Sequence, residues 1–343
     1  MATPDLTTLP KTHLHLHFTG SMRHSTMVTL AAEHGVRLPD TLADPRPMRL
    51  AATDERGWFR FQRMYDIARS VLQTEGDVRR LVREVAEDEK AEGSGWLEIQ
   101  VDPSGYAARF DGLTSFVELV LDATRSAAAQ TGVGIGLVIA ANRTRHPLDA
   151  RTLARLAARH AGAGVVGFGL ANDERRGRIG DFAPAFRIAR HAGLDAVPHA
   201  GELAGADSVR GAVEALGAAR IGHGVRAAEN VATVELLAER SIACEVCPSS
   251  NVALGVYPDL AAVPIRTLFD AGVPIALGAD DPLLFGDRLR RQYEIARDVH
   301  GFTDAGLAEL ARMSVRASRA PDDLRAKLSA GIDAWAGRTE PAR

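Results

Sequence analysis

The sequence predicts an α/β fold, a (β/α)8 barrel (TIM barrel) that takes up residues 1–343 as one domain. Eight short apolar runs alternate along the chain with stretches of helical period. Several runs are nearly continuous in Val, Ile and Leu, which is typical of strands buried on both faces. The chain length suits a barrel of about 250 residues with insertions. An open, doubly wound sheet is the alternative that the same alternation leaves possible.

The expected strands and helices follow one another without a Gly/Ser/Pro-rich linker. In chain order the strands are Thr12–Phe18, Gly95–Val101, Val133–Ala140, Gly164–Gly169, Leu194–His199, Arg220–His223, Ile242–Val246 and Val273–Gly278. The clearest helical patterns between them are Asp149–His160, Phe182–Ala192, Ser208–Leu216, Val231–Glu239 and Ile265–Ala271. A mostly helical insertion at about residues 21–92 follows the first strand, and we expect it to cover the carboxyl ends of the strands as a lid.

Composition excludes several classes of protein. Apolar residues make up 46% and charged residues 25% of the chain, as in ordinary soluble globular proteins. The 41 basic and 44 acidic side chains give a net charge of −3, which argues against a surface built for nucleic acid. Two cysteines provide no disulfide framework, and no apolar run is long enough for a membrane span. The N-terminus has no signal-peptide pattern, so we expect a cytoplasmic protein without a membrane or nucleic-acid partner.

Side chains able to bind a metal ion gather where the expected strands end. In a barrel of this class the carboxyl ends of the strands form one rim, where catalytic residues lie. His15 and His17 are two positions apart on a strand, so their side chains share a face. Three imidazoles and one carboxylate suit Zn²⁺ with an open position for water, although nickel, cobalt or ferrous iron accepts similar ligands. The candidate ligands at this rim are His15, His17, His199 and Asp280.

Further polar side chains near these strand ends are candidates for catalysis. Glu202 lies three residues beyond the third histidine, so it can transfer protons near the metal without binding it. His223, between two glycines, either orients the attacking water or is a core histidine bonded to the backbone. Asp281 diverges from the adjacent candidate ligand, so it can face the substrate. His13 shares the parity of the histidine pair but lies deeper, which favours a buried, hydrogen-bonded role.

Three other motifs have a plain structural interpretation. Residues 244–247 spell C-x-x-C but lack a thioredoxin-like context, which favours two buried thiols over a redox pair. Phe59, Phe61 and Tyr65 in the insertion favour packing within the lid over stacking on a heterocycle. Residues 249–251 read Ser-Ser-Asn, a turn sequence near the rim, and no G-x-S-x-G motif supports a serine nucleophile.

These residues stand in segments that resemble the adenosine deaminase family, one of the amidohydrolase-type metal-dependent barrels. The segments occur in the family's order over nearly the whole chain, and the ordered set is far more specific than any one tetrapeptide. They are Pro10–Lys11 with His15–Ser21, Val71–Glu75, Val165–Ala171, His199–Glu202, Arg220–Gly224, Glu245–Asn251 and Asp280–Leu283.

The resemblance implies a role for each candidate residue. Glu202 would protonate N1 of a purine nucleoside and carry a proton from the water, while His223 would position the attacking hydroxide. Asp281 would contact the N7 side of the purine. Hydroxide would add to C6 and ammonia would leave, as in other zinc deaminases. The ligands of one Zn²⁺ per chain would be His15, His17, His199 and Asp280.

Two departures from the family's pattern bear on the substrate. The family usually has H-L-D-G after its histidine pair, and its aspartate is expected to hold the 5′-hydroxyl of the nucleoside; Thr19 stands in that place here. Losing a hydrogen bond to a charged acceptor costs about 1.5–3 kcal/mol, which would weaken binding of plain adenosine and admit an anion near the 5′ end. Asn172 replaces a glycine whose N–H meets purine N3, and it keeps that N–H. The expected substrate contacts are His17, Thr19, Asn172 and Asp281.

The expected substrate is an adenine nucleoside modified at its 5′ carbon. Some members of the family deaminate 6-aminodeoxyfutalosine, which carries a benzoate there and belongs to an alternative route of menaquinone biosynthesis. Arg23, Arg60 or Arg145 could pair with such a carboxylate. Adenosine or deoxyadenosine, as in purine salvage, is the alternative substrate, followed by adenine, a methylated purine or another 5′-modified nucleoside. A mononuclear metal hydrolase of an amide or ester is the alternative from another class, and a barrel that only binds nucleosides would be expected to lack Glu202 or His223.

Overall fold

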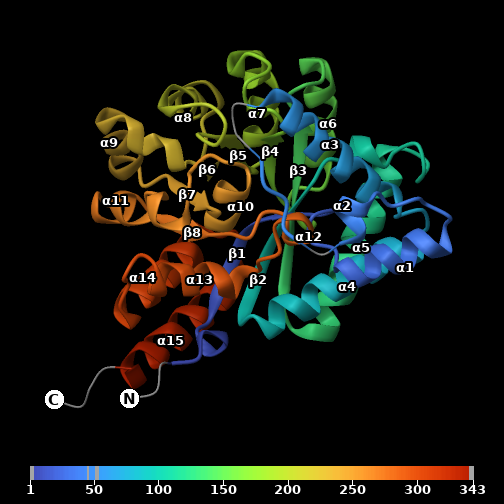
Figure 1. The fold of residues 1–343 in the computed structure, drawn as a ribbon. Helices are drawn as coiled ribbons and strands as arrows, with labels where there is room; N and C mark the ends of the chain where they lie inside the picture. The colour runs from blue at the N-terminus through green and yellow to red at the C-terminus, as the bar shows by residue number, and fades with distance from the viewer. Residues whose placement is uncertain (1–3, 45, 51–53, 340–343) are drawn as a thin grey trace.

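The computed structural model describes residues 4–44, 46–50 and 54–339, and eight parallel strands form its centre (Figure 1). The strands are β1 Lys11–His17, β2 Ser94–Val101, β3 Gly134–Asn142, β4 Val165–Ala171, β5 Asp195–Ala200, β6 Arg220–His223, β7 Ala243–Val246 and β8 Ile275–Leu277. They pair in chain order from β1 to β8. Each of the eight expected strands is present, and each predicted bound lies within two residues of the observed one.

The sheet closes into a barrel where β1 meets the segment after β8. The backbone N–H of His17 donates to the carbonyl of Asp280 at 2.9 Å, and that of Asp280 donates to the carbonyl of His15 at 3.0 Å. The predicted (β/α)8 barrel is therefore confirmed, and the open sheet is excluded.

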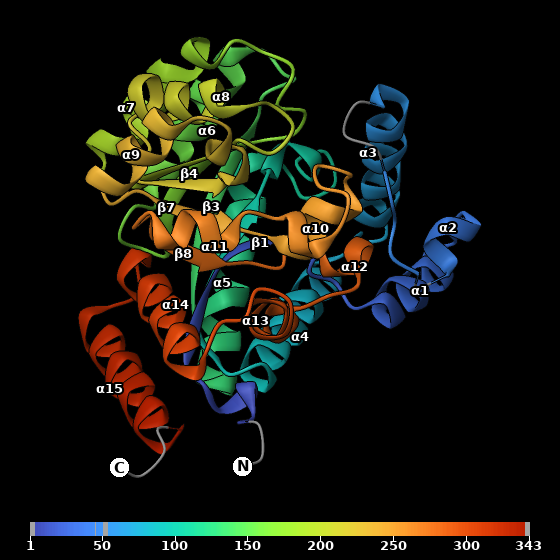
Figure 2. The same cartoon turned by 60° about the vertical axis from the view of Figure 1, so that its left-hand side comes forward.

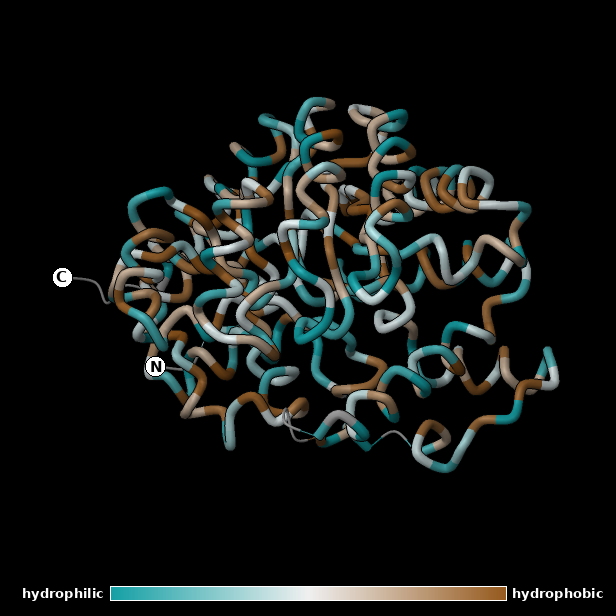
Figure 3. The backbone as a smooth tube through the Cα atoms, turned by 90° about the horizontal axis from the view of Figure 1, so that it is seen from above, coloured by the Kyte–Doolittle hydropathy of each residue, from teal (hydrophilic) through white to brown (hydrophobic). Residues whose placement is uncertain are grey.

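Helices surround the barrel and connect its strands. They are α1 His24–Glu33, α2 Asp40–Ala43, α3 Glu55–Ser70, α4 Glu75–Ala91, α5 Leu113–Thr131, α6 Pro147–Arg159, α7 Ala183–His191, α8 Ala206–Gly211, α9 Val231–Glu239, α10 Pro248–Ala253, α11 Ile265–Asp270, α12 Pro282–Phe285, α13 Leu289–Asp298, α14 Asp304–Ala317 and α15 Asp322–Thr339. Apolar and polar residues alternate along the helices (Figure 3), so each can bury one face and expose the other. None of the described helices combines the length and apolar character needed to cross a lipid bilayer.

The insertion after β1 divides into a lid and part of the barrel wall. α4 begins at a capping box formed by Thr74 and Asp77, and its buried Val and Leu side chains face inward. It packs on α5 and β2, so it belongs to the outer ring of helices. α1, α2 and α3 stand outside that ring (Figure 2), and we call these three helices the lid. Residues 45 and 51–53 of the predicted insertion lie outside the described residues.

The lid helix α3 docks through aromatic side chains. The ring of Phe61 is buried and stacks on Phe285 of α12, with centroids 5.7 Å apart. Trp58 packs against Phe61 at 5.1 Å. Phe59, by contrast, is 56% exposed. Phe61 therefore packs against its own helix and against α12, and Tyr65 lies beside it at 6.2 Å, but both also line the pocket described below. The expected packing within the lid is wrong for Phe59, which lies on the outer face of the helix.

A buried cluster of charges links strands inside the barrel. Arg220 of β6 is 2% exposed and donates to Glu245 of β7 at 2.7 Å and to Glu98 of β2. It also donates to Asp195 at the start of β5 at 3.2 Å. Both Glu98 and Glu245 are fully buried. A buried charge is costly unless it is paired and hydrogen-bonded, and here one guanidinium serves carboxylates from three strands.

Replacing Arg220 with methionine is expected to lower the free energy of unfolding by about 3–5 kcal/mol, because two buried carboxylates lose their partner. The measurement is urea denaturation followed by circular dichroism. Arg266→Met is the matched control: Arg266 pairs with Asp270 at 3.1 Å but is 50% exposed. It should cost no more than about 1 kcal/mol. Equally small losses in both variants would contradict the importance of the buried cluster.

Candidate active site

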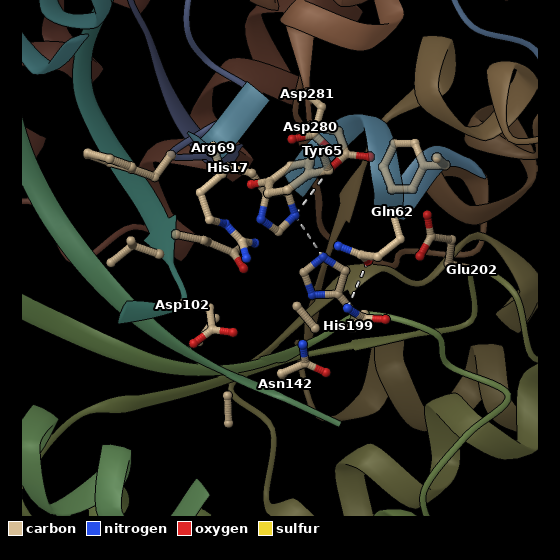
Figure 4. Close-up of a pocket in the computed structure, with 18 of the residues that line it drawn as sticks. His17, Gln62, Tyr65, Arg69, Asp102, Asn142, His199, Glu202, Asp280 and Asp281 are labelled. Carbon is tan, nitrogen blue, oxygen red and sulfur yellow. Dashed lines mark hydrogen bonds and ion pairs between the residues drawn. The ribbon is translucent and has the colours of Figure 1, made fainter. Parts of the chain in front are cut away.

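A pocket opens at the carboxyl ends of the strands, beneath the lid. It holds about 720 Å³ counted out to its mouth, and side chains from strand ends and from α3 line it (Figure 4). Positions 58, 61, 62, 65 and 69 share one face of α3, as their spacing requires. That face carries Trp58, Phe61, Gln62, Tyr65 and Arg69 into the pocket wall. The lid predicted from the position of the insertion therefore covers the rim.

Four predicted ligand residues converge at the base of this pocket. Nε2 of His17 lies 3.1 Å from Nε2 of His199 and 3.2 Å from Oδ1 of Asp280. Nε2 of His15 lies 3.6 Å from the same carboxylate oxygen. Ligand atoms of His15, His199, His223 and Asp280 all lie within 4.8 Å of one another, as do those of His17, Asp280 and Asp281.

The donor set fits a divalent metal ion. Nε2 of His15 and Nε2 of His223 are buried and have no hydrogen-bond partner among the residues that the structure describes. Both nitrogens face Asp280, at 3.6 and 4.0 Å, too far for hydrogen bonds. In the neutral ring of His15 the proton is on Nδ1, which donates to Glu245, so its bare Nε2 facing a carboxylate is costly without a cation between them. The site therefore has the nitrogen and oxygen ligands that a catalytic metal requires.

Two predicted ligands, His199 and Asp280, are held in the protonation states that bind metals. Burial, together with the neighbouring His15 and His17, holds the pKa of His199 well below its usual range. Burial alone would raise the pKa of Asp280, but the neighbouring imidazoles of His15 and His17 outweigh it and hold that pKa well below its usual range. A neutral imidazole and an ionised carboxylate are the states in which these side chains bind metals. Burial lowers the pKa of His15, but the carboxylates of Asp280 and Glu245 outweigh it and raise that pKa to about 10, so a bound metal ion would displace its proton.

Partners outside the pocket orient the cluster. Nδ1 of His15 donates to Glu245 at 2.8 Å, which turns Nε2 toward the rim. Nδ2 of Asn251 donates to Nδ1 of His223 at 3.2 Å. The hydroxyl of Ser250 bonds the carboxylate of Asp280. The sequence interpretation gave none of these partners a role, and the one signal was an acidic residue, Glu245, inside an apolar strand.

Glu202 and Asp281 are the buried carboxyl groups that face the predicted metal site. Oε1 of Glu202 lies 3.4 Å from Nε2 of His223. Burial, reinforced by Asp280, raises the pKa of Glu202 well above its usual range and that of Asp281 to about 7. Oδ1 of Asp281 has no hydrogen-bond partner among the described residues. A Cβ at Gly20 would meet that oxygen at 1.7 Å, so only glycine leaves room for it.

Three site residues turn the chain sharply where strands end. Asn172 directly after β4, His223 at the end of β6 and Asp280 after β8 have φ values of 80°, 63° and 62°. This left-handed region is uncommon for residues other than glycine. Such strain persists where the surrounding structure over-determines it, typically at functional sites. Here it turns three polar side chains over the end of the barrel.

Asn172 also links the rim to the lid. Its Nδ2 donates to Oε1 of Gln62 on α3 at 2.8 Å, and its Oδ1 accepts from the N–H of Asp173 at 2.7 Å. Both Asn172 and Gln62 line the pocket. The predicted substrate-contacting residues His17, Asn172 and Asp281 thus lie in its wall.

Thr19 differs from the expectation. It is fully buried, and its hydroxyl bonds the hydroxyl of Tyr106. Among the described residues Tyr106 lines the pocket and Thr19 does not. The expected direct contact of Thr19 with substrate is therefore corrected: its short side chain ends inside the wall and holds Tyr106, which reaches the cavity.

The arginine in the pocket is Arg69, which the sequence interpretation did not propose. Arg23 pairs with Asp88 at 2.7 Å, and Arg60 pairs with Asp54 at 3.1 Å. These two arginines and the exposed Arg145 are absent from the described residues that line the pocket. The proposed pairing of any of these three with a substrate carboxylate is therefore wrong for this geometry.

Arg69 lies against two aromatic rings. Its guanidinium carbon is 5.2 Å from the ring centroid of Tyr65 and 5.6 Å from that of Tyr106. Nη1 pairs with Asp66 at 3.2 Å, whereas the buried Nε has no partner among the described residues. Figure 4 shows the side chain on the same side of the pocket as Asp102. The site thus offers a cation near the histidine cluster.

Two plain structural interpretations are confirmed. Nδ1 of His13 donates to Glu89 at 2.8 Å, and its Nε2 accepts from the N–H of Ala279 at 3.0 Å. This buried histidine has both nitrogens satisfied. Cys244 and Cys247 are buried, free thiols, and burial raises the pKa of Cys244 to about 12. Such a thiol is inert at neutral pH.

Known proteins share this fold and sequence. A model of the family described as adenosine deaminase matches residues 10–335. A Streptomyces virginiae protein, provisionally named an adenosine/adenine deaminase, is 65% identical over 331 residues, covering 96% of this chain and 98% of that protein. The crystal structure of adenine deaminase from Arthrobacter aurescens matches with a TM-score of 0.87 and 29% identity, over 96% and 99% of the two chains. An amidohydrolase from Burkholderia ambifaria with bound zinc matches with a TM-score of 0.86 and 26% identity, over 97% and 93%.

The family match spans nearly the whole barrel, from the start of β1 into α15. It includes every strand end that contributes to the histidine and aspartate cluster. The similarity therefore spans the segments that carry the site as well as the architecture. The chain belongs to the adenosine deaminase family and is a metal-dependent aminohydrolase.

Proposed function

We propose that this enzyme hydrolyses the 6-amino group of an adenine compound and releases ammonia, with one Zn²⁺ per chain. The observation that carries the proposal is the convergence of a histidine and aspartate cluster with a buried carboxylic acid, Glu202, in one pocket. The names of the relatives support an adenine ring as the substrate. Their deaminase chemistry disfavours the amide or ester hydrolase.

Zinc is the metal that we propose. Three imidazoles and a carboxylate are ligands that zinc favours, and one structural relative contains it. When bound, it would act as a Lewis acid that makes hydroxide available from water near neutral pH. The residues that would hold it are His15, His17, His199 and Asp280.

Glu202 is the proposed proton donor and acceptor. Burial raises the pKa of Glu202, which favours the protonated carboxyl group, and that group can donate its proton to N1 of the ring. Protonation at N1 makes C6 more electrophilic. The ionised Glu202 then takes a proton from the attacking water and passes it toward the departing amine.

His223 and Asp281 are the proposed orienting groups. Because Asn251 donates to Nδ1 of His223, the neutral ring carries its proton on Nε2. That N–H faces Glu202 and Asp280 and can orient the attacking water. Asp281, with a pKa of about 7, is partly protonated at neutral pH and can donate to N7 of the ring.

The proposed substrate within this class is a nucleoside whose 5′ carbon carries an anion, such as 6-aminodeoxyfutalosine of menaquinone biosynthesis. Tyr106, held by Thr19, offers a hydroxyl group in place of the family's aspartate, and Arg69 offers a cation beside it. Adenosine or deoxyadenosine is the alternative, and the relatives' names also support free adenine.

Removal of zinc with a chelator is expected to reduce ammonia release by at least about 100-fold, because water is then no longer activated. One equivalent of Zn²⁺ per chain should restore the rate, measured together with metal content by atomic absorption. Full activity of metal-free protein would contradict the proposal. If another divalent ion restored ammonia release and zinc did not, that ion would replace zinc as the proposed metal.

Glu202→Gln is expected to lower kcat by about 10²- to 10⁴-fold, because an amide cannot exchange the proton. Bound metal should stay at the wild-type level, since Glu202 is not a proposed ligand. Glu118→Gln, which removes an exposed carboxylate on α5, is the matched control and should leave kcat unchanged. Near-normal turnover in the Glu202 variant would eliminate this residue as the acid.

Substrate choice is tested by comparing kcat/KM for 6-aminodeoxyfutalosine, adenosine and adenine. A preference of about 100-fold for the first, or about 2.7 kcal/mol, is expected if the anion is recognised. A preference for adenosine or adenine would overturn the 5′-anion proposal and leave deamination standing.

Arg69→Met should remove that preference. The loss for the anionic substrate is expected to be about 10- to 150-fold, the worth of one hydrogen bond to a charged group. Adenosine and adenine should change little. Arg60→Met is the control, because Arg60 lies on the same helix but is 61% exposed. Equal losses for all three substrates would assign Arg69 to packing of the lid.

A further inference from the structure

Glu174 is a buried carboxylate that the proposed chemistry does not use. It lies in the loop after β4 and is 5% exposed. Its two oxygens accept hydrogen bonds from four consecutive backbone N–H groups, those of residues 201–204, at 2.6, 2.9, 2.7 and 2.9 Å. The hydroxyl of Ser208 on α8 also donates to it.

Those four N–H groups belong to the loop that carries Glu202. The loop turns at Gly201, whose φ is +71°, and a Cβ there would meet Val209 at 2.4 Å. Four consecutive N–H groups directed at one point leave their donors unsatisfied unless an acceptor lies there. An unsatisfied buried donor costs about 1–3 kcal/mol, so the conformation of the loop depends on an acceptor in this place.

Arg143 fixes this arrangement from the other side. It is 3% exposed, and its guanidinium donates to the carbonyl of His199 at 2.6 Å and to the carbonyl of Glu174 at 3.2 Å. One side chain therefore ties the loop after β4 to the end of β5. The predicted ligand His199 and the proposed acid Glu202 lie on either side of Gly201. The hydrogen bonds of Glu174 and Arg143 hold this turn in place.

We propose that Glu174 is a positioning residue for the reaction: it fixes the backbone of residues 201–204 so that the carboxyl group of Glu202 faces the substrate. Glu174 lines no part of the pocket among the described residues, so it acts through the loop and not by contact with substrate. The proposal rests on the role of Glu202 in the proposed function.

Glu174→Gln tests the structural part of the proposal without any substrate. The NH₂ group of glutamine is itself a donor and cannot accept hydrogen bonds from the backbone N–H groups of the loop. The amides of the loop should therefore be less protected from hydrogen exchange. Hydrogen exchange measured by mass spectrometry is expected to be at least about 10-fold faster in a peptide spanning residues 200–205. Glu214→Gln is the control, because Glu214 is exposed and makes the same change of charge. Unchanged protection of the loop would overturn the proposal.

A double-mutant cycle tests the functional part. Glu174→Gln is expected to lower kcat by at least about 30-fold, with KM within about threefold and bound zinc unchanged. Added to Glu202→Gln, it should lower kcat by less than about threefold more, because the group that it positions is already gone. If the kcat loss of the double variant equals the product of the two single losses, Glu174 does not act through Glu202. A normal kcat in Glu174→Gln would overturn the proposal directly.

Glu174→Asp covers the case in which the glutamine variant does not fold. It keeps the anion but withdraws it by one methylene, so partial loss of kcat and of loop protection is expected. Loss of zinc and of melting temperature with normal kcat per bound zinc would assign Glu174 to stability alone. A wild-type enzyme that releases no ammonia from any adenine compound would refute the proposed function, whereas additive losses in an active enzyme refute only this inference.

Discussion

Compensation of buried charge is the constraint on which the site depends. Arg220 neutralises Glu98 and Glu245 inside the barrel, and Glu245 in turn accepts the Nδ1–H of His15. The second nitrogen of His15 is thereby directed at Asp280. Each link is buried, so removal of one leaves its neighbour with an unpaired charge. The stability of the barrel and the orientation of the metal ligands are consequences of the same chain of contacts.

The ends of the strands carry the polar side chains of the candidate active site. His223 and Asp280 adopt left-handed backbone conformations, which turn their side chains over the rim. α10 holds both in place, because Ser250 bonds the carboxylate and Asn251 bonds the imidazole. Strain in the backbone is thus balanced by hydrogen bonds from one short helix. The geometry of the site is pre-organised before substrate enters.

The lid and the rim define the rest of the pocket together. α3 contributes a face with apolar rings and one cation, Arg69. The bond between Gln62 and Asn172 joins this face to the loop after β4, and the same loop carries Glu174. The pocket wall proposed to contact the substrate and the loop that carries the proposed acid are therefore held by the same loop. The candidate metal ligands come from the barrel, whereas the residues proposed to choose among adenine compounds come from the wall.

The sequence by itself determined the fold class, the strands to within two residues and the set of side chains at the rim. It could do so because parallel strands buried on both faces leave a continuous apolar signal, and because the carboxyl ends of all strands in a barrel meet. The tertiary structure alone decided that Glu245 supports His15, that Glu174 holds residues 201–204 and that Tyr106 replaces Thr19 in the wall. These partners are far apart in the chain, and their contacts depend on the register of neighbouring strands and on the direction of each side chain. Local sequence patterns carry neither, because both are set by packing across the whole barrel.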